Sequence, residues 1–153
     1  MSQGVDATAQ SSQGPTRSAG EERNLQLIRQ FHDAGTSIQR LRESGLLAED
    51  VEWWVAGPRA ALPFAGTWRG PDGVAEFHRI LGETMRYDRT ELKEYIVDGD
   101  NVAAIFVGEG IARATGKPFR SEIMRLYTFK DGKIVRVRNF YDTAAYVAAV
   151  AGN

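Results

Sequence analysis

The chain has 153 residues, of which 42% are hydrophobic and 25% charged, and its formal net charge is −1. These values are typical of one soluble globular domain and give no electrostatic reason to expect nucleic acid or an anionic membrane as a partner. Because the chain has no cysteine, disulfide bonds, a thiolate nucleophile and cysteine-rich metal sites are excluded.

The rest of the composition points to a cytoplasmic protein without a metal or a cofactor. The two histidines, His32 and His78, are too few for a metal centre unless a carboxylate cluster lies beside them. No apolar run approaches the roughly 18 residues of a membrane span, and the N-terminus lacks the apolar core of a signal peptide. We therefore expect no membrane partner.

The chain begins with a predicted disordered tail, residues 1–20. This stretch is rich in Ser, Gln, Gly and Ala and offers little beyond Val5 as a sizeable apolar group. It buries too little surface to offset the entropy lost on ordering. We therefore place a single domain over residues 21–153.

The first part of the domain changes from a helical to an extended pattern. Apolar residues at helical spacing from Leu27 to Ile38 predict a first helix. Residues 37–50 predict a second, shorter helical segment, in which Gly45 is a break. Residues 51–57 predict the first strand.

The second part carries one long helix and a series of strands. Prolines and glycines over residues 58–71 indicate a long irregular connection, and a helix is predicted over residues 71–85. Turn signals then separate four strands, predicted over residues 89–100, 101–116, 117–132 and 133–142. This order predicts the α+β class, with a curled antiparallel meander, helices covering one of its faces, and a pocket between them.

Asp142 stands where the pattern changes for the last time. The residues before it alternate as in a strand, and residues 143–150 suit a short final helix. An aspartate there accepts hydrogen bonds from the free N–H groups of the first helical turn, worth roughly 1 kcal/mol. We interpret Asp142 as this cap, although the sequence leaves a role as a catalytic acid open.

Four segments carry a resemblance to a known family: "LIRQFHDAG", "LLAEDVEWWVAGP", "LPFAGTWRGPDGVAEFHRIL" and "YTFKDGKIVRVRNFYDTAA". From about Asn24 onward the chain resembles the SnoaL-like branch of the nuclear transport factor 2-like superfamily. That superfamily also holds ketosteroid isomerase, limonene-epoxide hydrolase and scytalone dehydratase. The resemblance implies a single cystatin-like domain, in which a cone-shaped curved antiparallel sheet and its covering N-terminal helices enclose a deep apolar pocket.

The resemblance also shows which catalytic groups are missing. The positions of the tyrosine, the base and the second acid of ketosteroid isomerases fall on Phe31, Val55 and Arg125. The positions of the arginine and two aspartates of the epoxide hydrolases fall on Gly108, Gly110 and Asn139. Neither reaction is expected by that machinery, because none of those side chains is present.

Two polar positions remain where SnoaL-like polyketide cyclases place a histidine and an aspartate. They hold Arg125 and Asn139, neither of which is an ordinary general base, but both suit orienting or polarising a carbonyl. With Tyr141 as a hydrogen-bond donor to a ligand, they are the predicted catalytic residues. Arg125 has a structural alternative, which is an ion pair with Asp33 or Glu76.

Strand alternation and the cone geometry predict the residues that bind a substrate. The predicted pocket wall consists of Phe31, Trp53, Val55, Phe64, Trp68, Phe106, Ser121 and Ile123. His32 faces either the pocket rim or solvent, and His78 follows the core residue Phe77. Neither histidine is favoured as catalytic, yet both stay open as acid–base groups.

These residues support two functions of different classes. The first is a cofactor-independent enzyme, of isomerase, cyclase, dehydratase or lyase type, acting on a small hydrophobic oxygenated molecule. The alternative is a non-catalytic protein that binds such a molecule in the same pocket, and a pure interaction module has the least support. We also expect a homodimer, because the outer sheet face carries an apolar patch of Ile105, Val107, Ile111, Met124, Leu126 and Phe140.

Overall fold

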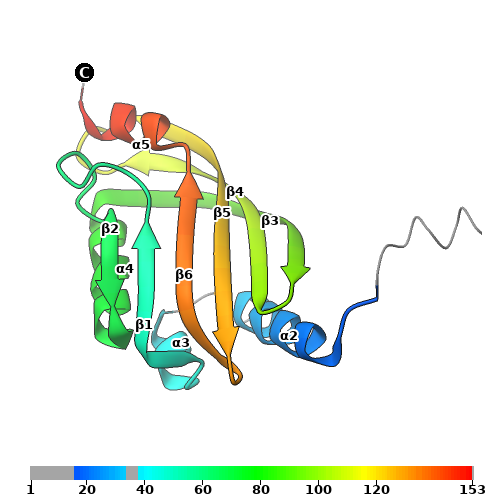
Figure 1. The fold of residues 1–153 in the computed structure, drawn as a ribbon. Coiled ribbons are helices and arrows are strands. Elements are labelled where there is room, and N and C mark those ends of the chain that lie inside the picture. Colours follow the sequence, from blue (N-terminus) through cyan, green and yellow to red (C-terminus); the bar gives the residue numbers. More distant parts are fainter. Residues whose placement is uncertain (1–15, 34–37, 153) are drawn as a thin grey trace, which may run out of the picture.

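The computed structural model describes residues 16–33 and 38–152, and Figure 1 shows how their elements are arranged. In chain order the elements are α2 (Ala19–Asp33), α3 (Ile38–Glu43), β1 (Leu47–Val55), β2 (Gly66–Arg69), α4 (Gly70–Thr84), β3 (Met85–Asp98), β4 (Asn101–Ala112), β5 (Pro118–Lys130), β6 (Lys133–Tyr141) and α5 (Thr143–Val150). The predicted α+β class is confirmed.

The six strands form one curved sheet in the order β2-β1-β6-β5-β4-β3. Strands β3 to β6 pair antiparallel with their neighbours in sequence, which confirms the predicted meander. Strand β1 joins the meander by pairing parallel with β6, and β2 pairs antiparallel with β1. The sequence pattern misses β2, because this strand has only four residues within a segment rich in glycine and proline.

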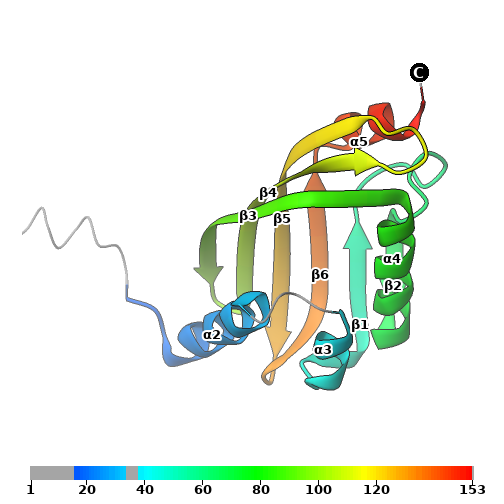
Figure 2. The same ribbon diagram turned by 180° about the vertical axis from the view of Figure 1, so that it is seen from behind.

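The helices α2, α3 and α4 lie on the concave side of the sheet, as Figure 1 and Figure 2 show from opposite sides. Helix α5 lies at one end of the sheet, against β4 and β5. The outer side carries no helix within residues 16–33 and 38–152. In the same ranges, every helix is too short or too polar to cross a membrane.

Helix α2 begins at Ala19, two residues before the predicted domain boundary. Its start is a reciprocal cap, in which the Glu21 N–H donates to Ser18 Oγ at 3.1 Å and the Ser18 N–H donates to Glu21 Oε1 at 2.8 Å. The prediction of disorder for residues 1–15 concerns residues outside those described.

The second predicted helix is shorter than its pattern indicates. Helix α3 ends at Glu43, and Gly45 adopts a left-handed φ of 72°. Leu47 then begins β1 opposite Ile134, with the Ile134 N–H donating to the Leu46 carbonyl at 2.7 Å. Pairing with β6 thus makes the end of this segment a strand instead of a helix.

The predicted assignment of strand faces holds across the cone. Trp53 is fully buried, whereas its neighbour Trp54 is partly exposed on the outer face. Arg125 on β5 and Asn139 on β6 are directly opposed and share the concave face. Strand alternation therefore correctly predicts that the two main candidate residues, Arg125 and Asn139, lie on the same face of the sheet.

Two glycines of β4 make room for β3. A side chain at Gly110 would place its Cβ 1.8 Å from the Arg86 carbonyl oxygen, at an irregularity in the β3–β4 pairing. A Cβ at Gly108 would lie 3.0 Å from Ile123 and 3.2 Å from the Tyr87 ring. The space beside Gly108 is thus filled by the side chains of Tyr87 and Ile123.

We predict that Gly110→Ala lowers the free energy of unfolding by about 3 kcal/mol or more, because a backbone oxygen cannot yield to the new methyl group. The matched control is Gly82→Ala in α4, where an added Cβ meets nothing within 4 Å. It should raise stability by up to about 1 kcal/mol, through helix propensity alone. Denaturant unfolding measures both, and equal effects of the two substitutions would contradict the packing at Gly110.

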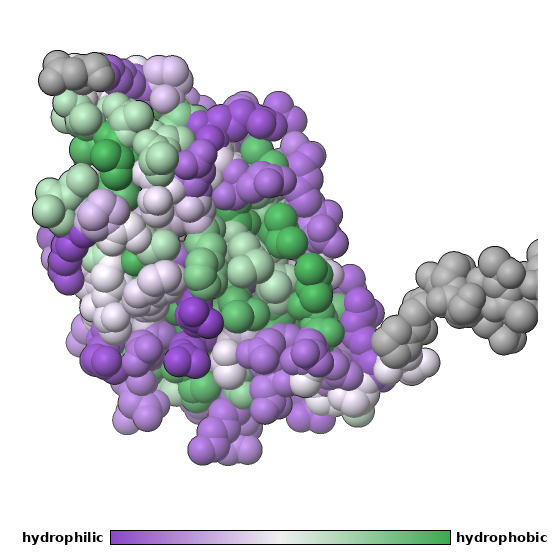
Figure 3. Space-filling model, turned by 45° about the horizontal axis from the view of Figure 1, so that its top comes forward, coloured by the Kyte–Doolittle hydropathy of each residue, from purple (hydrophilic) through white to green (hydrophobic). Residues whose placement is uncertain are grey.

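The outer face of the sheet presents the apolar patch expected from the sequence. Figure 3 shows hydrophobic residues gathered on this side and bordered by hydrophilic ones. All six side chains of the patch are partly exposed: Ile105, Val107, Ile111, Met124, Leu126 and Phe140. The charges beside them pair within the chain, since Glu109 lies 3.5 Å from Arg120 and Glu52 lies 4.0 Å from Arg136.

We predict that this face is buried against a second copy of the chain. Wild-type protein should sediment as a dimer at micromolar concentration, and Leu126→Glu should sediment as a monomer because the charge cannot be buried without a partner. Lys130→Glu, at the exposed end of the same strand, is the control and should remain dimeric. A monomeric wild-type protein would contradict the prediction.

Candidate functional site

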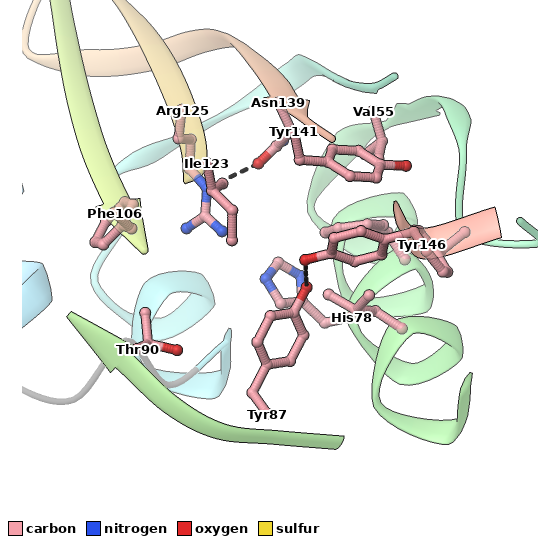
Figure 4. Close-up of a pocket in the computed structure, with 13 residues that line it drawn as sticks. Val55, His78, Tyr87, Thr90, Phe106, Ile123, Arg125, Asn139, Tyr141 and Tyr146 are labelled. Carbon is pink, nitrogen blue, oxygen red and sulfur yellow. Dashed lines mark hydrogen bonds between the residues drawn. The ribbon is translucent and has the colours of Figure 1, made fainter. Parts of the chain in front are cut away.

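A cavity of about 280 Å³ lies on the concave side of the sheet, and Figure 4 shows its lining. It is lined by Val55, Phe64, Phe77, His78, Leu81, Tyr87, Thr90, Phe106, Ile123, Arg125, Asn139, Tyr141 and Tyr146. Most of these side chains are apolar or aromatic, and none of these described residues carries a carboxylate. The volume is near the lower end of the roughly 300–1,000 Å³ of small-molecule sites, so the cavity suits a small apolar ligand.

Arg125 is the one guanidinium among these lining residues. Its Nε donates to Asn139 Oδ1 at 2.9 Å, and its Nη1 donates to the Tyr127 hydroxyl at 3.3 Å. The guanidinium carbon also lies 5.6 Å from the ring centroid of Trp53 and 5.9 Å from that of Phe106. The charge is therefore held by neutral acceptors and aromatic faces.

The structural alternative for Arg125, an ion pair with a carboxylate, finds no support in the described residues. None of their carboxylate oxygens lies within 4.0 Å of the guanidinium. Glu76 is exposed and pairs with Arg79, which lowers the pKa of the Glu76 carboxyl. The side chain of Asp33 lies outside the description.

A chain of hydrogen bonds runs from Arg125 to helix α2. Arginine can only donate, so the Tyr127 hydroxyl accepts from it. His32 bridges two hydroxyls, with Nε2 3.2 Å from that of Tyr127 and Nδ1 2.7 Å from that of Tyr95, and in a neutral ring one nitrogen donates and the other accepts. Burial, together with the charge of Arg125, lowers the pKa of His32 to about 4. His32 is thus a neutral member of this network. Its ring faces the interior of the fold and not solvent.

Asn139 has both ends of its amide engaged. Its oxygen accepts from Arg125, and its Nδ2 donates to the Trp54 carbonyl at 3.3 Å. The side chain is nearly buried, with 4% of its surface exposed. Asn139 therefore orients the guanidinium, and its contact with a ligand stays a prediction.

Tyr141 lines the cavity, but its hydroxyl donates to the Ala56 carbonyl. A phenol has a single proton, so Tyr141 can accept from a ligand and cannot donate to it. Burial raises the pKa of Tyr141, which keeps the phenol neutral. This corrects the predicted donor role.

Two tyrosines that the sequence reasoning missed also line the cavity and keep a proton available. The hydroxyls of Tyr87 on β3 and Tyr146 on α5 lie 2.7 Å apart and are drawn bonded in Figure 4. Two hydroxyls carry two protons and their mutual bond uses one, so the pair retains one proton for a ligand. Burial raises the pKa of both phenols. Asp142 positions Tyr146 indirectly, because its carboxylate accepts from Ala145 N–H at 3.1 Å and caps α5, which confirms the cap interpretation.

His78, which the sequence reasoning did not favour, lies in the cavity wall (Figure 4). Its Nδ1 lies 2.9 Å from the Val74 carbonyl, and its ring packs edge-on against Trp53 and Phe77. Burial is the main cause that lowers the pKa of His78 to about 4. The helical spacing could have predicted this position, because His78 is four residues after Val74 and lies on the same face of the helix.

The structure places only part of the predicted wall at the cavity. Val55, Phe64, Phe106 and Ile123 line it, while Phe31, Trp53, Trp68 and Ser121 do not. Strand alternation predicts the face on which a side chain lies but not how deeply it is buried. Trp53 lies on the predicted face, but it is completely buried beneath the guanidinium of Arg125.

The other three residues make contacts that support the fold. Phe31 packs on the hydrophobic core from α2. Trp68 donates from Nε1 to the Phe64 carbonyl and lies under the guanidinium of Arg59. The Ser121 hydroxyl donates to the Glu122 carbonyl and accepts from Asp142 N–H, so it secures the start of α5.

We predict that the buried, neutral His78 makes stability depend on pH. An unfolded histidine has its ordinary pKa of 6.5, whereas the folded value is about 4. The unfolded chain therefore binds more protons between these values, and stability that is fully present above pH 6.5 is lost as the pH falls toward 4. The loss due to His78 is on the order of 3 kcal/mol at most.

The measurement is denaturant unfolding of wild type and His78→Gln at several pH values. The carboxylates titrate alike in both proteins, so the difference between the two curves isolates His78. The variant should lose less stability on acidification. Parallel curves between pH 6.5 and 4 would contradict the assignment.

The comparisons with known proteins agree with this architecture. The sequence model of the SnoaL-like domain matches residues 26–137. UPF0523 protein B of Dictyostelium discoideum is 26% identical over 102 residues, which are 65% of this chain and 62% of that protein. The chain thus spans less than two thirds of the length of this curated relative.

Solved structures show the same fold over most of the chain. An NTF2-like protein of Burkholderia thailandensis E264 is 27% identical with a TM-score of 0.72, over 82% of this chain and 95% of that one. A protein of Jannaschia sp. CCS1, proposed to be a SnoaL-like polyketide cyclase, is 19% identical with a TM-score of 0.76, over 92% and 99%. From the match over residues 26–137 and the shared NTF2-like fold, we conclude that the chain belongs to the SnoaL-like domain family.

Proposed function

We propose that the protein is an enzyme that works without a cofactor and rearranges bonds of a small apolar molecule through an oxygen atom bound by Arg125. The observation that carries this proposal is a permanent cation in an apolar cavity, with no carboxylate beside it among the described residues. A guanidinium in such surroundings attracts an oxygen that gains negative charge, such as that of an enolate. Isomerases, cyclases and lyases that break a C–H bond next to a carbonyl form such an oxygen.

Neutral groups around Arg125 support this role. Asn139 and Tyr127 each take one N–H of the guanidinium, which leaves the Nη2 group without a protein partner in the described part of the chain. In Figure 4 this end of Arg125 points into the cavity. Its free N–H groups are aimed where a ligand oxygen would bind, and they need no rearrangement before they can act.

A non-catalytic binding protein is the second candidate. It is favoured by one observation, that no aspartate or glutamate is found among the described cavity residues. The common carboxylate base of this fold is thus missing from the wall. Binding of an oxyanion by Arg125 is common to both functions, and only the enzyme also changes its ligand.

We predict that 4-nitrophenol, whose coloured anion mimics an enolate, binds to the wild-type cavity as the anion. Its visible absorbance at a pH below the pKa of the free phenol reports the ionised fraction, which Arg125 should raise. Arg125→Leu should weaken binding by about 10- to 150-fold, the equivalent of 1.5–3 kcal/mol for a hydrogen bond to a charged group. The phenol that still binds should be colourless.

Arg120→Leu is the control, because Arg120 lies on the same strand but is exposed on the outer face. It should bind the anion as wild type does. Thermal melting of Arg125→Leu separates loss of the site from loss of the fold. A folded variant with unchanged binding of the anion would remove Arg125 from the site and contradict the proposal.

A further inference from the structure

We propose that His78 Nε2 is the catalytic base of this cavity, which removes a proton from a carbon next to a carbonyl whose oxygen is bound by Arg125. The substrate class is then an enolisable aldehyde or ketone with an apolar body. This inference rests on the proposed function and deepens it, because it names the proton acceptor, which the proposed function leaves unassigned.

The tautomer of His78 follows from a single contact. A backbone carbonyl can only accept, so the Nδ1 that lies 2.9 Å from the Val74 oxygen must carry the proton. In a neutral imidazole, Nε2 then carries the lone pair. Within residues 16–33 and 38–152 no hydrogen bond to Nε2 occupies this lone pair, and Figure 4 shows the ring among the cavity side chains.

The ring is held in place by its neighbours. The imidazole packs edge-on against Phe77 at 4.7 Å and Trp53 at 5.4 Å between centroids. Trp53 also lies beneath the guanidinium of Arg125, so one buried side chain supports both polar groups. A base and an oxygen-binding cation thus share one rigid wall.

The charges around the cavity affect how readily His78 takes up a proton. The other titratable groups that line the cavity are Arg125 from β5 and the phenols Tyr87, Tyr141 and Tyr146 from β3, β6 and α5. Burial raises the pKa of all three phenols, so that they stay neutral. Burial is the main cause of the low pKa of His78, and the charge of Arg125 lowers it further. An enolate bound to Arg125 neutralises this charge and therefore favours the imidazolium.

The proposed step is balanced within the site. The C–H bond breaks, its proton goes to His78 Nε2, and its electron pair forms the carbon–carbon double bond of the enolate. The π pair of the carbonyl moves onto the oxygen, where the guanidinium N–H groups bind it. If the substrate also carries a carbon–carbon double bond conjugated with the enolate, return of the proton from His78 to the far carbon of that double bond completes an isomerisation. Attack of the enolate carbon on a second carbonyl of the same molecule forms a carbon–carbon bond and an alkoxide, which takes the proton from His78 and completes a cyclisation.

The test uses 2-tetralone, a small bicyclic ketone, in D₂O. Proton NMR follows deuterium incorporation next to the carbonyl for wild type, His78→Gln and the control Arg120→Leu. Glutamine can still donate to the Val74 carbonyl but offers no basic nitrogen. We expect wild type and Arg120→Leu to accelerate exchange, and His78→Gln to lose this acceleration by about 100-fold or more. The wild-type rate should rise with pH through about 4 and then level off.

Binding of 4-nitrophenolate to His78→Gln separates this inference from the proposed function. Binding within about threefold of wild type, together with lost exchange, supports His78 as the base, since oxyanion binding is then intact. Wild-type exchange in a folded His78→Gln overturns the inference and leaves the proposed function standing. Intact anion binding without exchange by wild type also overturns it. Failure of wild type to bind the anion overturns the proposed function itself.

Discussion

The cavity depends on one physical constraint, a guanidinium placed among apolar and aromatic side chains without a carboxylate in its described surroundings. The hydrogen-bond partners of Arg125 are an amide and a phenol, not carboxylates. Burial, and to a lesser extent the charge of Arg125, lowers the pKa of both histidines, and burial raises the pKa of the phenols Tyr87 and Tyr146. At neutral pH the described cavity therefore carries a single net charge, which belongs to Arg125. This single charge is the basis of the proposal that the cavity binds an anion or a group that becomes one.

Burying a cation without a counter-ion costs free energy. Side chains from different parts of the fold offset this cost. Asn139 supplies an amide oxygen from the neighbouring strand, Tyr127 a hydroxyl from the same strand, and Trp53 an aromatic face from β1. His32 links the network to α2 through Tyr127. The arrangement keeps the guanidinium in one orientation while its outer N–H groups stay available.

The sequence predicts the sheet well because strand alternation is a local property with a period of two. It follows that Arg125 and Asn139 share a face, and the register places them opposite each other. The depth at which a side chain is buried, and its distance from other side chains, depend on residues that are far apart in the sequence. Trp53 has the predicted orientation but lies below the cavity, and Tyr87 enters only because Gly108 leaves space for its ring. His78 shows a further limit, since helical spacing marks its face but not the strand residues that α4 packs against.

Helix α5 forms one side of the cavity and is a separate element from the sheet. Asp142 caps its first turn, Ser121 holds the residue before it, and the Thr115 hydroxyl donates to the Ala149 carbonyl near its end. The helix contributes Tyr146 to the wall without belonging to the sheet. Members of the family could therefore diverge in ligand selectivity by exchanging this eight-residue helix alone. The strands that hold Arg125 would be inherited unchanged, so that chemistry and specificity could evolve on separate segments.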